Sequence, residues 1–383
     1  MVGGMGDGNA NNFRTLDSSG SEEEQVPSAI LYIVLMVYSA TVLVGVLGNI
    51  TLIKVFLTAK SMQSAPNIFI ASLAVGDTLL LIACVPVETM RYFSETWIFG
   101  RAGCKIISFI QLTSVGVSVF TLTALSADRY QAVVRPLDVQ LSNALLRTCS
   151  RVAVIWMVSM LLATPEAVFS DLYSFTVPGV NQSLVTCAPQ PPSERRWQEV
   201  HSLVCFMVFY LIPLVVISTY YCLIARTLIW SGPGLPGEEH SHTRKQIVSR
   251  KRLAKTVLVL VLMFALCWLP NHLLYLYRSF TYQSIDPSIG HLLATFLCRA
   301  LAFSSSCLNP FALYWLSRSF RSHFNRQLCC LCPTLFRQPH LPQQQSQRAS
   351  LDHGTTSATR ASLPLTELKS QPEDETSRQV NGE

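Results

Sequence analysis

The chain has 383 residues, of which 50% are hydrophobic and only 14% charged, and its mean hydropathy is +0.34. A soluble domain keeps roughly a quarter of its residues charged, so this composition excludes an ordinary soluble protein and favours a membrane protein. The formal net charge of +6 needs no nucleic-acid partner, because basic residues gather beside apolar segments.

Seven stretches are apolar enough to cross the hydrocarbon core of a bilayer, which takes about 20 mainly apolar residues. Backbone polar groups cannot stay unpaired in lipid, so we expect each stretch to be a helix and the protein to be an all-α seven-helix bundle. The seventh stretch is the weakest because polar residues interrupt it. The predicted spans are 29–57, 66–89, 103–134, 149–169, 203–228, 257–277 and 289–316.

Basic residues near the span ends predict the orientation. The segment from Arg226 to Lys255 carries seven Lys or Arg, whereas Arg14 is the only basic residue of the N-terminal tail. We therefore expect the N-terminus outside the cell and the C-terminus inside. Residues 1–25 lack an apolar core, so we expect no cleaved signal peptide.

These features divide the chain into four parts: an extracellular tail (1–28), a seven-helix membrane domain (29–316), a short cytoplasmic segment (317–330) and a tail (331–383). Ser317–Leu328 alternates basic and apolar residues, which predicts an amphipathic helix lying on membrane lipid. The tail is rich in Gln, Ser, Thr and Pro, which predicts disorder. The candidate palmitoylation sites are Cys329, Cys330 and Cys332.

Two cysteines fall outside the membrane in this topology: Cys104, at the start of the third span, and Cys187, between the fourth and fifth. An oxidising compartment favours a disulfide between them, and two free thiols are the alternative. Asn181 begins an Asn-Gln-Ser glycosylation signal in the same loop.

The third span ends with Asp128-Arg129-Tyr130. An arginine beside a carboxylate can keep one face of a bundle closed and, when released, engage a partner. A solvated charge pair at the membrane surface is the alternative.

Asp77 lies in the middle of the apolar second span, where a carboxylate needs partners. Polar residues at matching depths on other spans make a candidate sodium site, since hard cations take oxygen ligands. A hydrogen-bond network around a protonated Asp77, without a cation, is the alternative. The residues at these depths are Asn49, Ser118, Ser305 and Asn309.

Prolines inside spans remove backbone hydrogen bonds and favour kinks. The sixth span reads Phe264-Ala265-Leu266-Cys267-Trp268-Leu269-Pro270, which is a candidate hinge. Pro213 in the fifth span precedes Tyr221 by eight residues, and the seventh span contains Asn309-Pro310. Simple bundle geometry is the alternative use of each proline.

Together these residues resemble the rhodopsin-like class of G protein-coupled receptors, from about Gly48 to Cys330. The resemblance implies that Arg129 meets a G protein when the sixth helix moves outward, that Cys104 and Cys187 are disulfide-bonded, and that arrestin and receptor kinases act on the tail. One departure is that Tyr314 follows Pro310 by four residues rather than three. One helix step is about 100° of rotation, which puts the usual approach of this tyrosine to Tyr221 in doubt.

Local runs narrow the resemblance further. Residues 109–120, 165–170 and 270–277 are similar to the bombesin receptor family, and residues 244–270 and 312–317 look closest to its subtype-three branch. This implies a bombesin-like peptide as ligand, with signalling through Gq, phospholipase C and calcium. Gln111 resembles the branches that bind gastrin-releasing peptide or neuromedin B, because mammalian subtype-three receptors have arginine there.

The ligand pocket is expected to open outward between the third, fifth, sixth and seventh helices. Amine receptors of this class use an aspartate where this chain has Gln111, so a peptide is favoured over a small cation. The alternative to ligand binding for Arg278 is contact with lipid headgroups, and for Arg299 it is a structural ion pair with a carboxylate of the pocket. The aromatic residues expected at the mouth are Tyr275, Tyr277 and Phe280. The predicted ligand-binding residues are Gln111, Glu166, Pro189, Arg278, Arg299, Trp268 and Tyr275.

Three other functions remain as alternatives. A transporter or channel would show related halves or interrupted helices. An intramembrane enzyme would need a nucleophile and base within the spans, and His272 alone does not supply them, so we expect no enzyme and no cofactor besides sodium. A receptor of the same family with little affinity for natural bombesin peptides is the third.

Overall fold

The computed structural model describes residues 28–94, 96–134, 144–176, 183–189, 195–230, 241–281 and 289–331. Of residues 175–176, 183–184, 228, 230, 241–250 and 328–331 it describes the backbone only. Seven membrane-spanning segments are present in these ranges, as predicted. They are α1 (Ser28–Thr58), α2 (Ala65–Ala83) with α3 (Val85–Met90), α4 (Gly100–Val134), α5 (Ala144–Phe169), α6 (Arg195–Phe206) with η3 (Met207–Leu211) and α7 (Ile212–Trp230), α8 (Ser241–Thr281) and α9 (Ile289–Leu316).

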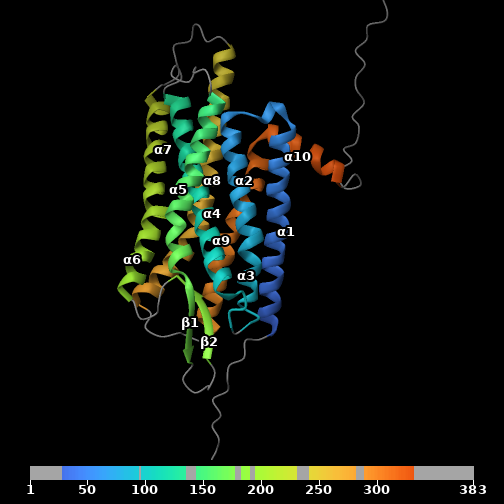
Figure 1. Cartoon of the computed structure of the whole chain (residues 1–383). Helices are drawn as coiled ribbons and strands as arrows, with labels where there is room; N and C mark the ends of the chain where they lie inside the picture. The colour runs from blue at the N-terminus through green and yellow to red at the C-terminus, as the bar shows by residue number, and fades with distance from the viewer. Residues whose placement is uncertain are drawn as a thin grey trace, which may run out of the picture. The chain divides into compact units, whose positions relative to one another are not determined.

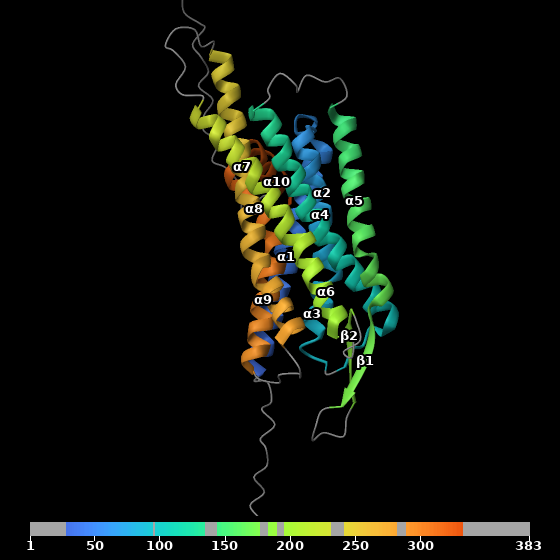
Figure 2. The ribbon, with the colours of Figure 1, turned by 90° about the vertical axis from the view of Figure 1, so that its left-hand side faces the viewer.

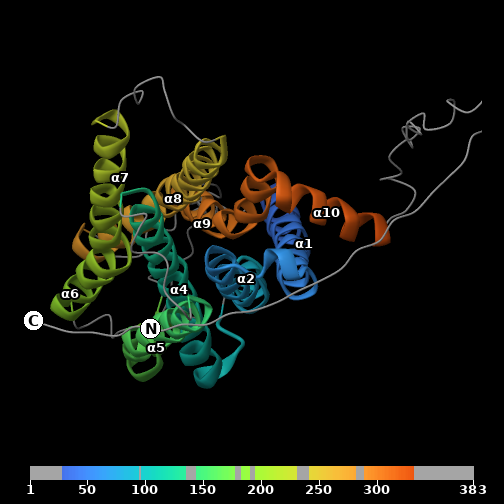
Figure 3. The same ribbon diagram turned by 90° about the horizontal axis from the view of Figure 1, so that it is seen from above.

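The helices run side by side as a bundle, with a β-hairpin at one end and α10 (Arg318–Leu331) at the other (Figure 1). These ends are called the hairpin end and the α10 end below. The view along the bundle shows α4 among α2, α5, α7 and α8, and it packs against all four (Figure 3). Side chains on different faces of α4 can therefore contact four other helices of the bundle.

The outer surface of the bundle is apolar, as a lipid-facing surface must be. On α1, Tyr32, Met36 and Leu43 are largely exposed, whereas Val34 and Tyr38 are fully buried. In water this exposed apolar face would be unfavourable, but in a bilayer it contacts lipid tails of similar polarity. The exposed face of α1 thus agrees with the membrane assignment made from composition.

Two spans are interrupted beside prolines. The second span breaks at Cys84, just before Pro86, so that α2 and α3 are separate helices. In the fifth span a π-helical turn, η3, comes directly before Pro213. Proline has no N–H to donate to the previous turn, and a local change of helix type accommodates the missing bond. Pro270 and Pro310 lie inside the continuous helices α8 and α9.

The hairpin at one end of the bundle was not predicted from the sequence. Strands β1 (Asp171–Thr176) and β2 (Ser183–Ala188) pair antiparallel with Leu172 opposite Cys187, and α5 passes directly into β1 (Figure 2). Cys187 is disulfide-bonded to Cys104 on α4, with Cα atoms 5.6 Å apart, which confirms the predicted pair. The disulfide therefore ties β2 to the first turns of α4.

An ion pair holds the other strand of the hairpin. Arg101 on α4 pairs with Asp171 at the start of β1. The backbone N–H of Leu172 also donates to Asp171 at 2.8 Å, and this bond, followed by Arg101, lowers the pKa of the carboxyl below its ordinary value. Both strands are thus anchored to α4 by different chemistry.

The helix predicted after the seventh span is present as α10. Phe320 and Phe324 are buried, whereas Arg318 and Arg321 are exposed, so the helix is amphipathic as expected. It packs against α1 and α9. Asn181, the predicted glycosylation site, lies outside the described residues, and so do residues 332–383, which include Cys332. The side chains of Cys329 and Cys330 are also outside them.

Candidate functional site

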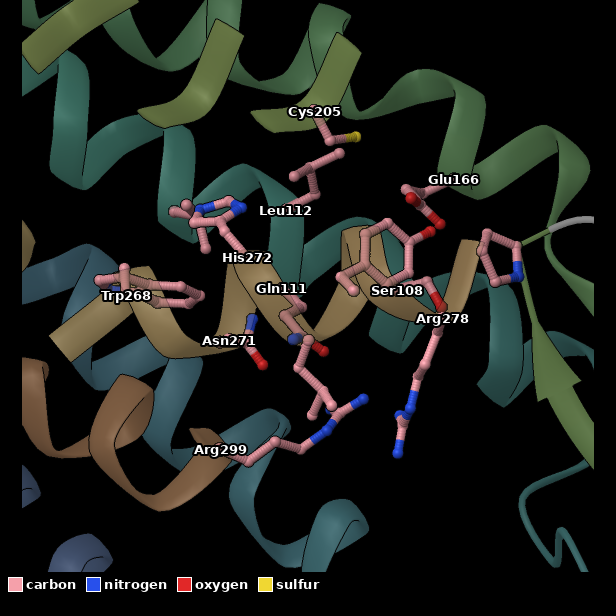
Figure 4. Close-up of a pocket in the computed structure, with 14 residues that line it drawn as sticks. Ser108, Gln111, Leu112, Glu166, Cys205, Trp268, Asn271, His272, Arg278 and Arg299 are labelled. Atoms are coloured by element: carbon pink, nitrogen blue, oxygen red, sulfur yellow. The ribbon is translucent and has the colours of Figure 1, made fainter. Parts of the chain in front are cut away.

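A cavity of about 170 Å³ lies toward the hairpin end, between α4, α5, α6, α8 and α9. Figure 4 shows side chains of these helices converging on it, with Arg299 on one side and Glu166 and Cys205 on the other. All seven residues predicted to bind a ligand line this single cavity. They are Gln111, Glu166, Pro189, Arg278, Arg299, Trp268 and Tyr275.

Gln111 is placed on α4 where two cavities meet. It lines the main cavity and a second one of about 120 Å³ that also reaches Ser108 and Arg299. Among the described residues its side chain has no hydrogen-bond partner, although it is half-buried. An amide can both donate and accept, so Gln111 offers free hydrogen-bonding groups to the contents of the cavity. A ligand that pairs with Gln111 would gain this otherwise unmade interaction.

Arg299 is held by a carboxylate that the sequence analysis did not single out. Its Nη1 lies 3.0 Å from Oε2 of Glu88 on α3, and Arg91 lies 3.6 Å from the same carboxylate. The alternative suggested for Arg299, a pair with a pocket carboxylate, is therefore present, and Arg299 lines the cavity as well. Glu88 could have been found as an acidic residue near the end of an apolar span.

Arg278 contacts the neighbouring helix rather than only the membrane surface. Its guanidinium donates to Nε2 of His291 on α9, with Nη2 at 2.8 Å. Thr295, one turn further along α9, is a second partner. Tyr277 and Phe280 do not line the cavity and are 50% and 43% exposed, contrary to the expectation that they would face its mouth.

On the opposite wall, Glu166 has two polar neighbours. The Ser170 hydroxyl donates to its Oε2 at 3.1 Å, and Nε2 of His201 on α6 lies 3.2 Å from its Oε1. The Tyr275 hydroxyl is 3.3 Å from Nδ1 of the same histidine. His201 therefore joins α5 to α8, although the sequence analysis did not select it.

Trp268 lies at the inner end of the cavity. Its Nε1–H donates to Oγ of Ser305 on α9 at 3.0 Å, and only 4% of the residue is exposed. The rings of Phe264 and His272 lie 6.0 Å and 6.1 Å from the Trp268 ring. A ligand that reached this depth would contact an indole that is bonded to the seventh span.

The polar cluster around Asp77 lies deeper, between α2 and α9. Ser306 and Asn309 each donate to one oxygen of this buried carboxylate at 2.8 Å, and Ser118 is a further hydrogen-bonding neighbour. Asn49 donates to the Ser306 carbonyl at 2.9 Å. Ser306, rather than the predicted Ser305, is thus the serine that meets Asp77.

At the α10 end, Arg129 pairs with Asp128, as predicted, and is only 5% exposed. It lines a cavity of about 360 Å³ that also includes Thr256 of α8 and Phe320 of α10. This end of the bundle therefore has a hollow with an arginine in its wall.

Tyrosines connect the helices around Arg129. The Tyr221 hydroxyl donates to the Ala254 carbonyl of α8 at 2.9 Å, and the rings of Tyr130 and Tyr220 lie 5.4 Å apart. The Tyr314 hydroxyl bonds Asn325 of α10 at 3.1 Å and not Tyr221. Tyr314, which follows Pro310 by four residues rather than three, therefore contacts α10 instead of α7.

Sequence comparison shows which known proteins this chain is similar to. The model of the seven-transmembrane receptors of the rhodopsin family matches residues 48–314. The chain belongs to this family. It is also 58% identical over 354 residues to the [Phe13]-bombesin receptor of Bombina orientalis, covering 92% of this chain and 89% of the relative. It is 59% identical over 321 residues to bombesin receptor subtype-3 of Ovis aries, covering 84% and 79%. The protein is therefore a G protein-coupled receptor of the bombesin receptor family.

Family membership settles several broader expectations for this receptor. It is a multi-pass plasma-membrane protein, it couples to G proteins, and it is not an enzyme. The alternatives of a transporter and of an intramembrane enzyme are thereby excluded. Sequence reasoning missed three residues in or beside the cavities: Glu88, His201 and Cys205. Glu88 and His201 make contacts between helices, whereas Cys205 contacts His201 on the same helix.

Proposed function

We propose that this receptor binds a bombesin-like peptide in the cavity at the hairpin end. The observation that carries the proposal is the position of Gln111, which has no hydrogen-bond partner among the described residues and lies in a cavity with Arg299 and Glu166 on opposite sides. Both relatives are named as bombesin receptors, which supports the same ligand class.

The size of the cavity limits how much of a peptide can enter. Its volume of about 170 Å³ is below the ~300–1,000 Å³ usual for pockets that enclose a small ligand. We propose that only the amidated C-terminal end of the peptide enters and that the rest contacts the hairpin. The amide of Gln111 can pair with peptide amides, and the two arginines suit carbonyl groups.

Signalling is proposed to run from this cavity to the α10 end. The N-terminus lies outside the cell and the α10 end faces the cytoplasm, as the basic residues of the 226–255 segment favour. Arg129 leaves Asp128 when α8 moves outward and then engages a G protein of the Gq class, which acts through phospholipase C and calcium. Arrestin and receptor kinases act on residues 331–383, Asn181 is glycosylated, and Cys329, Cys330 and Cys332 are palmitoylated.

We also propose that Asp77 binds a sodium ion together with Ser118. Ser306 and Asn309 already donate to the carboxylate, so the ion would use its remaining lone pairs. The buried Oδ1 of Asn49 has no hydrogen-bond partner among the described residues, which offers a further oxygen close by. Both oxygens of Asp77 have hydrogen-bond donors without a cation, and a cation-free network is the alternative. The sodium dependence of peptide affinity in Asp77→Asn and wild-type receptor distinguishes the two states.

Competition binding tests the ligand directly. Cells expressing the receptor are incubated with radiolabelled bombesin and increasing unlabelled peptide, and the expected result is saturable displacement. No displacement at micromolar peptide would contradict the proposal. It would favour the second candidate function, a receptor of the same family with little affinity for natural bombesin peptides.

A further inference from the structure

Three potential metal ligands meet on one wall of the ligand cavity. Glu166 comes from α5, and His201 and Cys205 come from α6. His201 and Cys205 are four residues apart, a spacing that puts them on the same face of the helix. One ligand atom from each residue lies within 4.8 Å of the other two. Among the described residues this is the one such group of three.

The distances in this cluster suit a zinc ion. Nε2 of His201 lies 3.2 Å from Oε1 of Glu166 and 3.7 Å from Sγ of Cys205. A tetrahedral zinc ion with bonds of about 2.0–2.3 Å holds nitrogen and oxygen ligands about 3.3 Å apart, and nitrogen and sulfur about 3.5 Å apart. Two of the three ligand pairs are therefore close to a binding geometry, and the ligand atoms of the third pair, Glu166 and Cys205, lie within 4.8 Å of each other.

The outer contacts of the cluster also have the form that supports a metal. The Tyr275 hydroxyl lies 3.3 Å from Nδ1 of His201, so it can fix the ring with Nε2 directed at the cluster. The Ser170 hydroxyl donates to Oε2 of Glu166 and leaves Oε1 for the ion. Metal-binding histidines and carboxylates are commonly held by such second hydrogen bonds.

We propose that Glu166, His201 and Cys205 bind one zinc ion that bridges α5 and α6. The mixed set of oxygen, nitrogen and sulfur favours zinc over calcium or magnesium, which prefer oxygen alone. Three protein ligands leave a fourth position, which water or a ligand group fills. Because Glu166 and Cys205 line the cavity, the ion lies in its wall.

Zinc binding can be measured on the purified full-length receptor in detergent, in oxygen-free buffer without a reductant, so that the Cys104–Cys187 disulfide stays intact and Cys205 stays a thiol. Metal is removed with a chelator, and bound zinc is then quantified by equilibrium dialysis against buffered zinc chloride. The wild type is compared with Cys205→Ser and His201→Asn, which remove one ligand atom each. The matched control is Cys267→Ser on α8, since Cys205 and Cys267 are both 8% exposed.

The expected result is one more tightly bound zinc per chain in the wild type and Cys267→Ser than in Cys205→Ser and His201→Asn. Wild type and Cys205→Ser contain the same histidines. Zinc bound by histidines elsewhere in the chain therefore cancels when the zinc contents of these two proteins are compared. Zinc is also expected to raise the melting temperature of the wild type, a readout that needs no variant to fold.

Equal zinc content in all four proteins, or a wild-type melting temperature that zinc leaves unchanged, would overturn the proposal. Either result would leave a metal-free contact between Glu166 and His201, with Cys205 as a packing residue. The measurement uses no peptide, so its failure is separate from a failure of the proposed ligand.

Discussion

Glu88 on α3 and Arg299 on α9 form an ion pair with an N–O distance of 3.0 Å, and both residues line the smaller cavity. The Glu88 side chain is 8% exposed and that of Arg299 is 21% exposed, so neither charge is well solvated. Each charge is therefore tolerated largely because of the other. The pair links the broken end of the second span to the seventh.

Arg299→Gln is expected to lower both thermal stability and peptide affinity. Removing one member of a buried pair typically costs about 3–5 kcal/mol, and the loss here is smaller because Arg91 lies 3.6 Å from Glu88. Melting temperature of the purified receptor and competition binding measure the two effects.

The double variant Glu88→Gln/Arg299→Gln separates stability from binding. It removes both charges, so it should recover most of the lost melting temperature while peptide affinity stays low. If the double variant regains full affinity, Arg299 serves the fold and not the ligand.

Gln111→Arg is expected to weaken the response to bombesin. The longer cation would lie near Arg299 and Arg278 in the same cavity, and the neutral amide offered to the peptide would be lost. Loss of a hydrogen bond with an unpaired buried group costs roughly 1–3 kcal/mol, or about 5- to 150-fold in affinity. The concentration of bombesin that gives half-maximal calcium release measures the effect.

Ser108→Ala is the matched control for Gln111→Arg, since both positions line the same two cavities on α4. It should change potency far less, because it introduces no charge. A Gln111→Arg receptor with wild-type potency would show that the peptide does not reach this part of the cavity.

The seven spans could be predicted because lipid requires long apolar helices, but their ends could not. Helix α8 begins at Ser241 rather than near Val257, since a helix continues beyond the hydrocarbon core once it has started. The hairpin was missed because nothing in the apolar pattern marks Asp171–Thr176 as a strand.

The cavity residues on α4, α8 and α9 could be predicted because their depth in each span follows from sequence position. Contacts that depend on how neighbouring helices are rotated could not be predicted in this way. Glu88 meets Arg299, Ser306 replaces Ser305 beside Asp77, and Tyr314 reaches Asn325. One residue along a helix turns a side chain by about 100°, so depth alone cannot choose between neighbours.

Gly48→Ala is expected to destabilise the contact between α1 and α9. A Cβ at Gly48 would lie 2.9 Å from Cγ of Pro310, and the proline ring cannot rotate away. Overpacking of this kind costs about 1–3 kcal/mol, more than the gain of up to about 1 kcal/mol from alanine in a helix. The melting temperature of the purified variant should therefore fall.

Gly76→Ala provides the comparison for Gly48→Ala. A Cβ there would meet Cγ1 of Val117 at 3.2 Å, which a small shift can relieve. Its melting temperature should stay close to that of the wild type. Equal melting temperatures for both variants and the wild type would mean that Pro310 is not held rigidly against α1.

Asp128→Asn is expected to raise signalling in the absence of peptide. Arg129 is 5% exposed and pairs with Asp128, so removing the carboxylate frees its guanidinium to engage a G protein. If the closed, inactive state loses about 1.4 kcal/mol of stability relative to the active state, the ratio of active to inactive receptor rises about tenfold. Basal inositol phosphate accumulation, measured at matched surface expression, should rise severalfold. Asp128→Glu keeps the negative charge and should remain near the wild-type level. A basal level in Asp128→Asn no higher than in Asp128→Glu would mean that the pair is an interfacial contact without a role in switching.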